Sequence, residues 1–141
     1  MVIGIGVGAF VYVRHALNTV EQNRNKASKE LDSIRPMPGS QFIRRGTIAK
    51  GSHGTVTDHY NSQASYESIR EYYSEEFARL GWKLEHERKV NVRDQDVGAV
   101  ELDFCKDGES AGLFFLRKQE SSENITYTVG TSWGLGCGRK F

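Results

Sequence analysis

The sequence predicts an α+β fold in which one helix packs on an antiparallel sheet of about four to six strands, after an N-terminal membrane and stalk helix. Three observations predict it. Residues 65–82 repeat with helical periodicity and carry signals at both ends, the residues after them switch to a period of two, and Pro36-Met37-Pro38-Gly39-Ser40 separates both from an apolar start. A chain of 141 residues suffices for one compact domain with an accessory segment.

The charge of the chain is nearly balanced, with a formal net charge of +1. Residues 1–35 hold five of the 19 Lys and Arg and three of the 18 Asp and Glu, so residues 36–141 hold fourteen and fifteen. A protein that binds nucleic acid through its general field shows a basic excess. We therefore expect no nucleic-acid partner.

Residues 2–13 carry no charge and are followed by Arg14-His15. About 20 apolar residues are needed to cross a bilayer core, so the run is short for a span. It fits the visible part of a membrane anchor, a secretory apolar region without its basic flank, or a buried strand. We favour an anchor over residues 1–17, and this makes the membrane the first expected partner.

Gly4, Gly6 and Ala9 also match the dinucleotide fingerprint G-x-G-x-x-G/A. That motif works only after a strand and at the start of a helix, and three residues are too few for the strand. We expect no cofactor. Small residues in an apolar run also allow close contact with other helices, here through Gly4 and Gly8.

Residues 18–35 have the pattern of a polar helix, with a seam broken by Arg24. The seam consists of Leu17, Val20, Arg24, Ala27, Leu31 and Ile34. It is too short and too polar for firm pairing, so we expect a solvated stalk. The following Pro/Gly segment predicts a boundary, which leaves residues 36–141 as the globular domain.

The helix over residues 66–80 is the clearest element, with Ser65 able to cap its start and Gly81 able to end it. Residues 42–50 and 55–60 precede it as expected strands. One apolar helix face, together with a tryptophan that folds back, is expected to form the core against the sheet. These residues are Tyr66, Ile69, Tyr73, Phe77, Leu80 and Trp82.

After the helix, alternation and turn signals predict four further strands at residues 82–92, 99–106, 111–118 and 124–133. Loops of hairpin length favour sequential antiparallel pairing, with the helix across one face. In that order Cys105 does not lie on a strand adjacent to the last one. A glycine-rich tail would have to cross the intervening strand to bring Cys137 near it.

Cys105 and Cys137 are the two cysteines, and their spacing does not suit a zinc site. A disulfide and two free thiols are the alternatives, and the compartment decides between them. We favour the disulfide. It agrees with an extracytoplasmic domain, whereas the basic residues after the apolar run favour a cytoplasmic one. We expect the periplasmic side of a bacterial inner membrane, with a single pass.

The aromatic side chains exceed what one helix–sheet interface buries. If Phe115 faces the helix, Phe114 and Leu116 face away from it, and Tyr72 lies beside the main helix stripe. Either residues 40–50, the tail or the stalk cover this second face, or Tyr72, Phe114 and Leu116 belong to an apolar interaction surface. Coverage is the favoured interpretation.

Few residues suggest chemistry. His53, Asp58 and His59 are a conceivable metal site, but no further ligand has supporting spacing, so surface or turn histidines are favoured. The carboxylate pairs Glu75/Glu76, Asp94/Asp96 and Glu101/Asp103 are expected on exposed faces and a turn. No Ser or Cys has a nucleophile context. We expect no catalytic residues and no bound metal.

The run Tyr72-Tyr73…Phe77…Leu80-Gly81-Trp82, with a later Phe-Cys-Lys strand end, resembles small bacterial membrane-anchored envelope domains of uncharacterised function. The likeness covers residues 36–133, and its specific part is the helix that ends in Gly-Trp. It implies the fold and a tether but no active site. We therefore expect a membrane-tethered, non-catalytic accessory or binding module with a protein partner in the envelope. A structural subunit of a larger membrane complex is the alternative, and a hydrolase or metal-dependent enzyme is the least favoured.

Overall fold

The computed structural model describes residues 4–92, 95–116 and 124–137, and gives side chains for 19–90, 98–116 and 124–137. Within these residues the α+β prediction is confirmed. The elements in chain order are α1 (Gly4–Ser33), β1 (Gln41–Lys50), β2 (His53–Asn61), α2 (Tyr66–Arg79), β3 (Lys83–Val92), β4 (Gln95–Lys106), β5 (Glu109–Leu116) and β6 (Tyr127–Trp133).

The strands form one antiparallel sheet in the order β1-β2-β6-β5-β4-β3. Strands β3 to β6 pair in sequence, as the hairpin-length loops predict, and the β1–β2 hairpin joins beside β6. The two-residue turn between β4 and β5 places Asp107 and Gly108 at positive φ (51° and 77°), the conformation of a tight hairpin turn.

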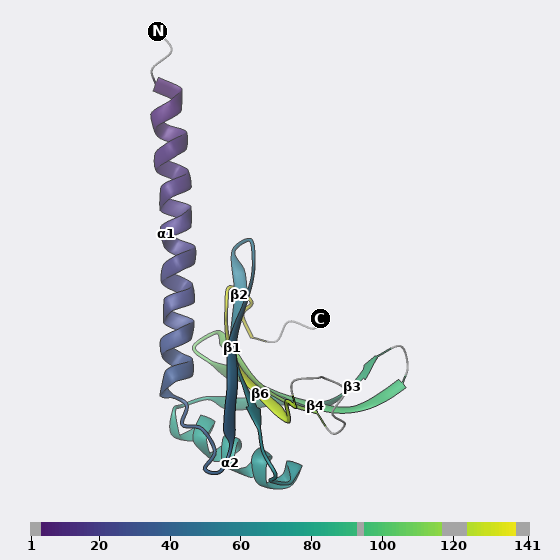
Figure 1. Cartoon of the computed structure of the whole chain (residues 1–141). Helices are drawn as coiled ribbons and strands as arrows, with labels where there is room; N and C mark the ends of the chain where they lie inside the picture. The colour runs from purple at the N-terminus through teal and green to yellow at the C-terminus, as the bar shows by residue number, and fades with distance from the viewer. Residues whose placement is uncertain (1–3, 93–94, 117–123, 138–141) are drawn as a thin grey trace.

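Both helices lie on one side of the sheet (Figure 1). The sheet is strongly bent, so that the β1–β2 hairpin stands steeply against β3 and β4, with α1 and α2 on the outer side of the bend. The inner, concave side faces away from the helices. This arrangement corrects the expectation of a single helix on the sheet.

Helix α2 has the ends that the sequence predicts. The Ser65 hydroxyl accepts from the Ser68 N–H, and Gly81 adopts φ +88°, which lets the Trp82 N–H donate to the Phe77 carbonyl at 2.9 Å. The Trp82 ring meets the Phe77 ring edge to face at 6.1 Å. Ile69, Tyr73, Phe77 and Trp82 are buried, while Tyr66 and Leu80 are partly buried against the same core.

The second half of α1 is part of this core and not a free stalk. Ala27 and Leu31 of α1, and Ile34 directly after it, are buried where this segment lies on the sheet beside β2 and β6. The Thr131 hydroxyl on β6 donates to the Ala27 carbonyl at 2.6 Å. The stalk prediction for residues 18–35 is therefore wrong for this part of the helix, because Ala27, Leu31 and Ile34 form an apolar stripe that the sheet covers.

Arg45 ties β1 to the end of α1. Its guanidinium donates to Asp58 on β2 at 2.7 and 2.9 Å and to Asp32 on α1 at 2.7 Å. Asp58 is buried and therefore needs this partner. The contacts hold the β1–β2 hairpin against the helix.

Glu76 holds the segment after α1, although the sequence predicts it on an exposed helix face. Its carboxylate is 4% exposed and accepts from the Arg35 backbone N–H at 2.9 Å and from the side chains of Arg35 and Arg79. The hydrogen bond from Arg79, followed by those from Arg35, lowers the pKa of Glu76 to about 2. Its burial corrects the sequence prediction.

The disulfide prediction is confirmed. Cys105 and Cys137 are bonded, with Cα atoms 5.8 Å apart. Since β5 lies between β4 and β6, the chain after β6 crosses the sheet to reach Cys105, as the strand order requires.

The expected anchor, residues 1–17, falls at the edge of what the structure describes. Residues 1–3 lie outside the described residues, and of residues 4–17 only the backbone, which is helical, is described. A buried strand at residues 2–13 is thereby excluded. In the part of the chain whose side chains are placed, no helix is both long and apolar enough to cross a membrane.

Candidate functional site

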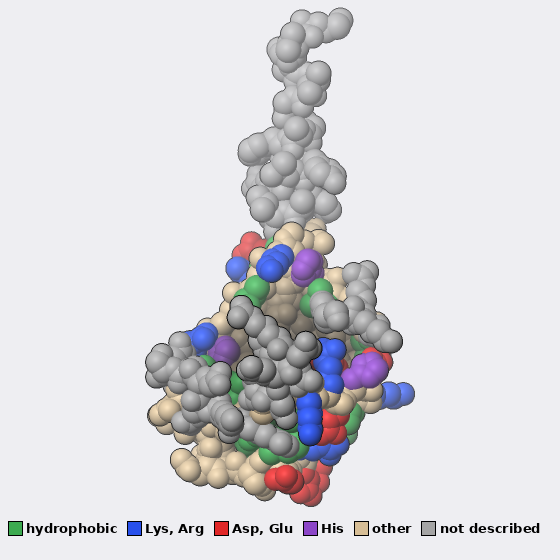
Figure 2. Space-filling view, turned by 90° about the vertical axis from the view of Figure 1, so that its right-hand side faces the viewer, with side chains coloured by type: hydrophobic (Ala, Val, Ile, Leu, Met, Phe, Trp, Pro, Cys, Tyr) green, Lys and Arg blue, Asp and Glu red, His purple; other side chains and the backbone are tan. Residues whose placement is uncertain are grey.

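The concave side of the sheet carries a hollow of about 550 Å³, within the range of about 300–1,000 Å³ typical of small-molecule sites. Figure 2 faces this side, where charged and histidine side chains gather along one margin. The hollow reaches from β2, across β6, β5 and β4, to β3. Strand spacing of about 4.8 Å makes the path from β2 to β4 about 14 Å long.

The register of the strands sets which side chains enter the hollow. Residues that pair directly across strands share a face, and three cross-strand rows therefore run over the concave side. The central row consists of Thr57, Gly130, Gly112, Asp103 and His86. The row on one side consists of His59, Thr128, Phe114, Glu101 and Arg88, and Thr55, Ser132 and Ser110 stand on the other.

Gly112 and Gly130 leave the middle of the hollow without side chains, and we call this pair the glycine floor. A Cβ at Gly130 would lie 3.0 Å from the Thr57 methyl and 3.1 Å from the Val56 carbonyl, so packing accounts for that glycine. A Cβ at Gly112 would meet the Leu102 carbonyl at 3.4 Å, an ordinary contact. Packing does not require glycine at position 112. Its missing side chain has its main effect on the depth of the hollow.

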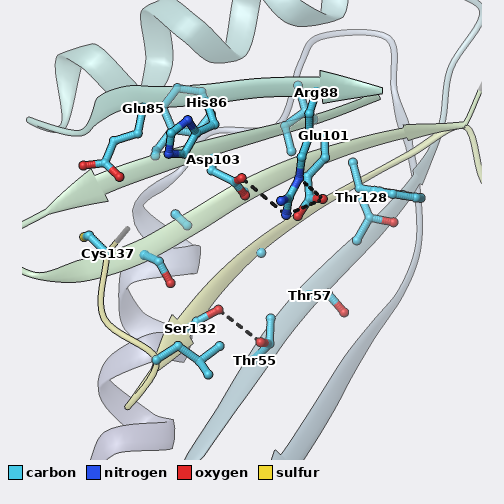
Figure 3. A pocket seen from close by; sticks show the side chains of 18 of the residues that line it. Thr55, Thr57, Glu85, His86, Arg88, Glu101, Asp103, Thr128, Ser132 and Cys137 are labelled. Carbon is cyan, nitrogen blue, oxygen red and sulfur yellow. Dashed lines mark hydrogen bonds and ion pairs between the residues drawn. The ribbon is translucent and has the colours of Figure 1, made fainter. Parts of the chain in front are cut away.

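Hydroxyl groups from β2 and β6 form one end of the hollow (Figure 3). The hydroxyls of Thr55 and Ser132 lie 3.0 Å apart, and those of Thr57 and Thr128 lie within 3.1 Å of the two ring nitrogens of His59. A hydroxyl both donates and accepts, so this end offers either role to a ligand. Its side chains are held in place by one another.

Charged groups from β3 and β4 form the other end. Arg88 lies 3.1 Å from a carboxylate oxygen of Glu101 and 3.7 Å from one of Asp103. The dashed lines in Figure 3 mark both contacts. The two carboxylates are each about a third exposed (31%). Burial, followed by the nearby charge of Asp103, raises the pKa of Glu101. One guanidinium therefore faces two carboxylates, which leaves this end with a negative excess.

The three residues predicted for an interaction surface do not lie together. Phe114 and Leu116 point away from the helices and are half-buried, and Phe114 lines the hollow. Tyr72 lies on α2, on the other side of the sheet, where its hydroxyl donates to the carbonyls of Arg35 and Pro36. Phe115 faces α2, with its ring 5.1 Å from that of Tyr66.

Within the described residues, the tail covers one margin of the second face and leaves a hollow beside it. Residues 41–50 extend the sheet as β1, and α1 packs on the helix side. Of the tail, Leu135, Gly136 and Cys137 line one margin of the hollow. The side chains that β2, β4 and β6 turn toward the hollow are Thr, Ser, Asp and Glu, and apolar atoms of residues such as Phe114 and Leu135 line it beside them.

His53, Asp58 and His59 do not converge. Asp58 is buried on the helix side and bound by Arg45, whereas His59 lies on the concave side between two threonines. Neighbouring residues of a strand point to opposite faces, which separates Asp58 from His59. Among the described residues, no group of three or more His, Cys, Asp or Glu could hold a metal ion.

Glu101 and Asp103 are the residues that the sequence interpretation missed, since it places them on a solvated outer face. Asp94 lies outside the described residues, and so does the side chain of Asp96. The missed signal is a combination: carboxylates two residues apart on β4 lie opposite Phe114 and Gly112 on β5. A strand face that places glycine opposite a carboxylate indicates a hollow beside a charge.

No protein-family model, curated protein or solved structure matches this chain. The arguments about its function therefore rest on the geometry of the hollow.

Proposed function

We propose that this chain is a membrane-tethered, non-catalytic binding module of the bacterial envelope, and that the concave side of the sheet is its binding face. One observation carries the proposal: the 550 Å³ hollow joins hydroxyls, an aromatic ring and a charged cluster over a floor of glycine. Concave sites with a few convergent polar groups are where proteins bind small ligands.

His59 links two strands of the binding face and holds the threonine hydroxyls of the hollow in place. Both of its ring nitrogens face threonine hydroxyls, at 3.1 and 3.0 Å, so the ring bridges β2 and β6. The disulfide supports an extracytoplasmic domain, because such bonds persist in oxidising compartments. The uncharged residues 2–13 support the tether.

Two cell experiments test the location. The chain should stay in the membrane fraction after a high-salt wash, and a membrane-impermeant thiol reagent should label intact cells only after reduction. Release of the chain by salt would refute the tether. Labelling without reductant would refute the disulfide in cells, and a lack of labelling after reduction would refute the extracytoplasmic location.

A third experiment tests the binding face. A photo-crosslinking phenylalanine analogue at Thr128, in the hollow, should give an adduct in intact cells that Gly112→Leu abolishes. The same analogue at Glu71, exposed on α2, is the control and should give none. Equal adducts at both positions, or insensitivity to Gly112→Leu, would refute the concave side as the binding face.

The second candidate is the structural subunit of a larger membrane complex, and the sheet edges favour it. The large hydrophobic side chains most exposed among the described residues are Phe42 (54%) and Ile48 (66%) on β1 and Leu84 (42%) on β3. Both strands lie at the edges of the sheet, where partner chains add strands. Stoichiometric subunits after mild-detergent purification would support this candidate, and a lone monomer would exclude it.

A further inference from the structure

The hollow carries enough chemistry to define a class of ligand. This inference rests on the proposed binding function and deepens it. A ligand must match three features of the hollow: the hydroxyl end, the glycine floor with the Phe114 ring beside it, and the charged end at Glu101, Asp103 and Arg88. They follow one another over about 14 Å, the distance from β2 to β4.

The charged end calls for a cation. The single positive charge of Arg88 balances one of the two carboxylate charges. Glu85, which also lines the hollow, adds a further negative charge, and His86 is the other basic group in the lining at this end. An ammonium group beside Glu101 and Asp103, next to the Arg88 guanidinium that contacts both, would relieve the remaining repulsion between them. A negatively charged ligand would meet that repulsion instead, so uronic acids and phosphates fit this end poorly.

The hydroxyl end and the floor fit a sugar better than a peptide. Extended peptides are held by unpaired backbone groups at a sheet edge, whereas here the face of the sheet is used and its backbone groups are paired between strands. Hydroxyls such as those of Thr55, Thr57 and Ser132 match the mixed donors and acceptors of sugar hydroxyls. A carboxylate can accept from two neighbouring sugar hydroxyls, and the Phe114 ring offers an apolar face to the C–H side of a sugar ring.

We propose that the concave side binds an oligosaccharide that contains amino sugars. Its rings lie over the glycine floor beside Phe114, its hydroxyls pair with the threonine and serine hydroxyls, and an ammonium group lies beside Glu101 and Asp103. The ligand runs across the strands and not along them, because the rows that line the hollow cross β2, β6, β5 and β4.

Calorimetry with the full chain, purified in mild detergent with its disulfide intact, tests this with three probes. They are the β-1,4-linked glucosamine tetramer, its fully N-acetylated form and tetralysine, at mildly acidic pH where the amines are protonated. We expect the glucosamine tetramer to bind at least about tenfold more tightly than either comparison probe, since a charged hydrogen bond contributes about one order of magnitude.

Three variants locate the binding. Gly112→Leu fills the floor and should abolish binding. Asp103→Asn, which keeps the shape and removes the charge, should weaken binding of the glucosamine tetramer about tenfold and leave the acetylated tetramer unchanged. Glu71→Gln removes one charge from the exposed side of α2 and should have no effect. Melting temperatures show that each variant is folded, and Asp103→Asn decides the case if Gly112→Leu does not fold.

The outcomes separate this inference from the proposed function. Equal binding of both tetramers overturns the ammonium assignment. Tetralysine that binds as tightly as the sugar, and is lost with Gly112→Leu, overturns the saccharide assignment while the hollow stands as a binding face. If none of the probes binds, or if Asp103→Asn has no effect, the inference fails. The crosslinking, fractionation and labelling experiments still decide the proposed function.

Discussion

The two faces of the sheet are built from alternate residues of the same strands, yet they differ in kind. The face under the helices holds Val56, Leu102, Leu113, Tyr127 and Val129, which are buried. The concave face holds hydroxyls, charges and glycines at the positions between them. One face is filled to form a core, and the other keeps a space. Stability should therefore depend on the first face and binding on the second.

The disulfide is expected to make the largest single contribution to stability on the concave side, since it bonds the tail, which crosses β5, to β4. Replacing both Cys105 and Cys137 with Ser should lower the free energy of unfolding by about 4 kcal/mol, because the bond closes a loop with a sequence separation of 32 residues. Urea unfolding measures the loss. The native protein in reductant should have the same stability as the variant. A change below about 1 kcal/mol would show that the concave side does not depend on the disulfide.

A pair of neighbours on β5 compares the faces directly. Leu113 is completely buried and Phe114, the next residue, is half-buried in the hollow. Leu113→Ala should cost about 3 kcal/mol through lost burial and the cavity left behind, whereas Phe114→Ala should cost about 1 kcal/mol or less. Urea midpoints of the two variants suffice. Equal losses would mean that the concave face is packed as a core.

Glu76 tests how the helix side is closed. Glu76→Gln should cost about 2 kcal/mol, because it weakens the charged hydrogen bonds from Arg35 and Arg79 around a buried group. Glu75→Gln, at the exposed neighbouring position, is the matched control and should change stability by less than about 0.5 kcal/mol. Similar effects at both positions would contradict the role of Glu76.

The same group predicts a pH dependence. The pKa of Glu76 is lowered from 4.5 to about 2 in the folded state, so its contribution is fully present above pH 4.5 and is lost as pH falls toward 2. Glu87, whose pKa the Arg70 guanidinium and the Tyr66 hydroxyl also lower to about 2, acts in the same window. Urea unfolding across that range should show Glu76→Gln losing part of the acid sensitivity of the native protein.

The smallest effect has the opposite sign. Gly112→Ala should stabilise the chain by about 0.5–1 kcal/mol, because a strand interior disfavours glycine and a Cβ fits there. Gly130→Ala should destabilise it, since its Cβ would lie 3.0 Å from Thr57. Thermal melting separates the two. A loss of stability with Gly112→Ala would show that this glycine serves packing and not the hollow.

Local rules predict much of this fold. Helical spacing with a serine cap and a terminal glycine predicts α2, alternation predicts the meander β3 to β6, and the strand order predicts how the tail reaches Cys105. Each of these depends on residues close in sequence or on one pairing rule.

The rest depends on contacts between distant segments. Ala27, Leu31 and Ile34 look like part of a polar seam until the sheet is in place to cover them. Glu76 looks solvated because its partner Arg35 lies 41 residues away. The hollow depends on the pairing register between strands and on the bend of the sheet. Neither can be predicted from the sequence of a single strand.

Helix α1 also determines how the domain is oriented relative to its N-terminal end. It runs without a break from Gly4 to Ser33, about 45 Å at 1.5 Å per residue, and its last turns are locked into the core by Ala27 and Leu31. Because the helix is continuous and its C-terminal turns are packed in the core, it fixes the orientation of the domain relative to its N-terminal end. A membrane or partner that binds the N-terminal end of α1 therefore also sets the direction in which the concave side faces. Two glycines inserted near residue 20 would make the orientation of the domain independent of the N-terminal end of the helix and would leave the fold of the domain intact.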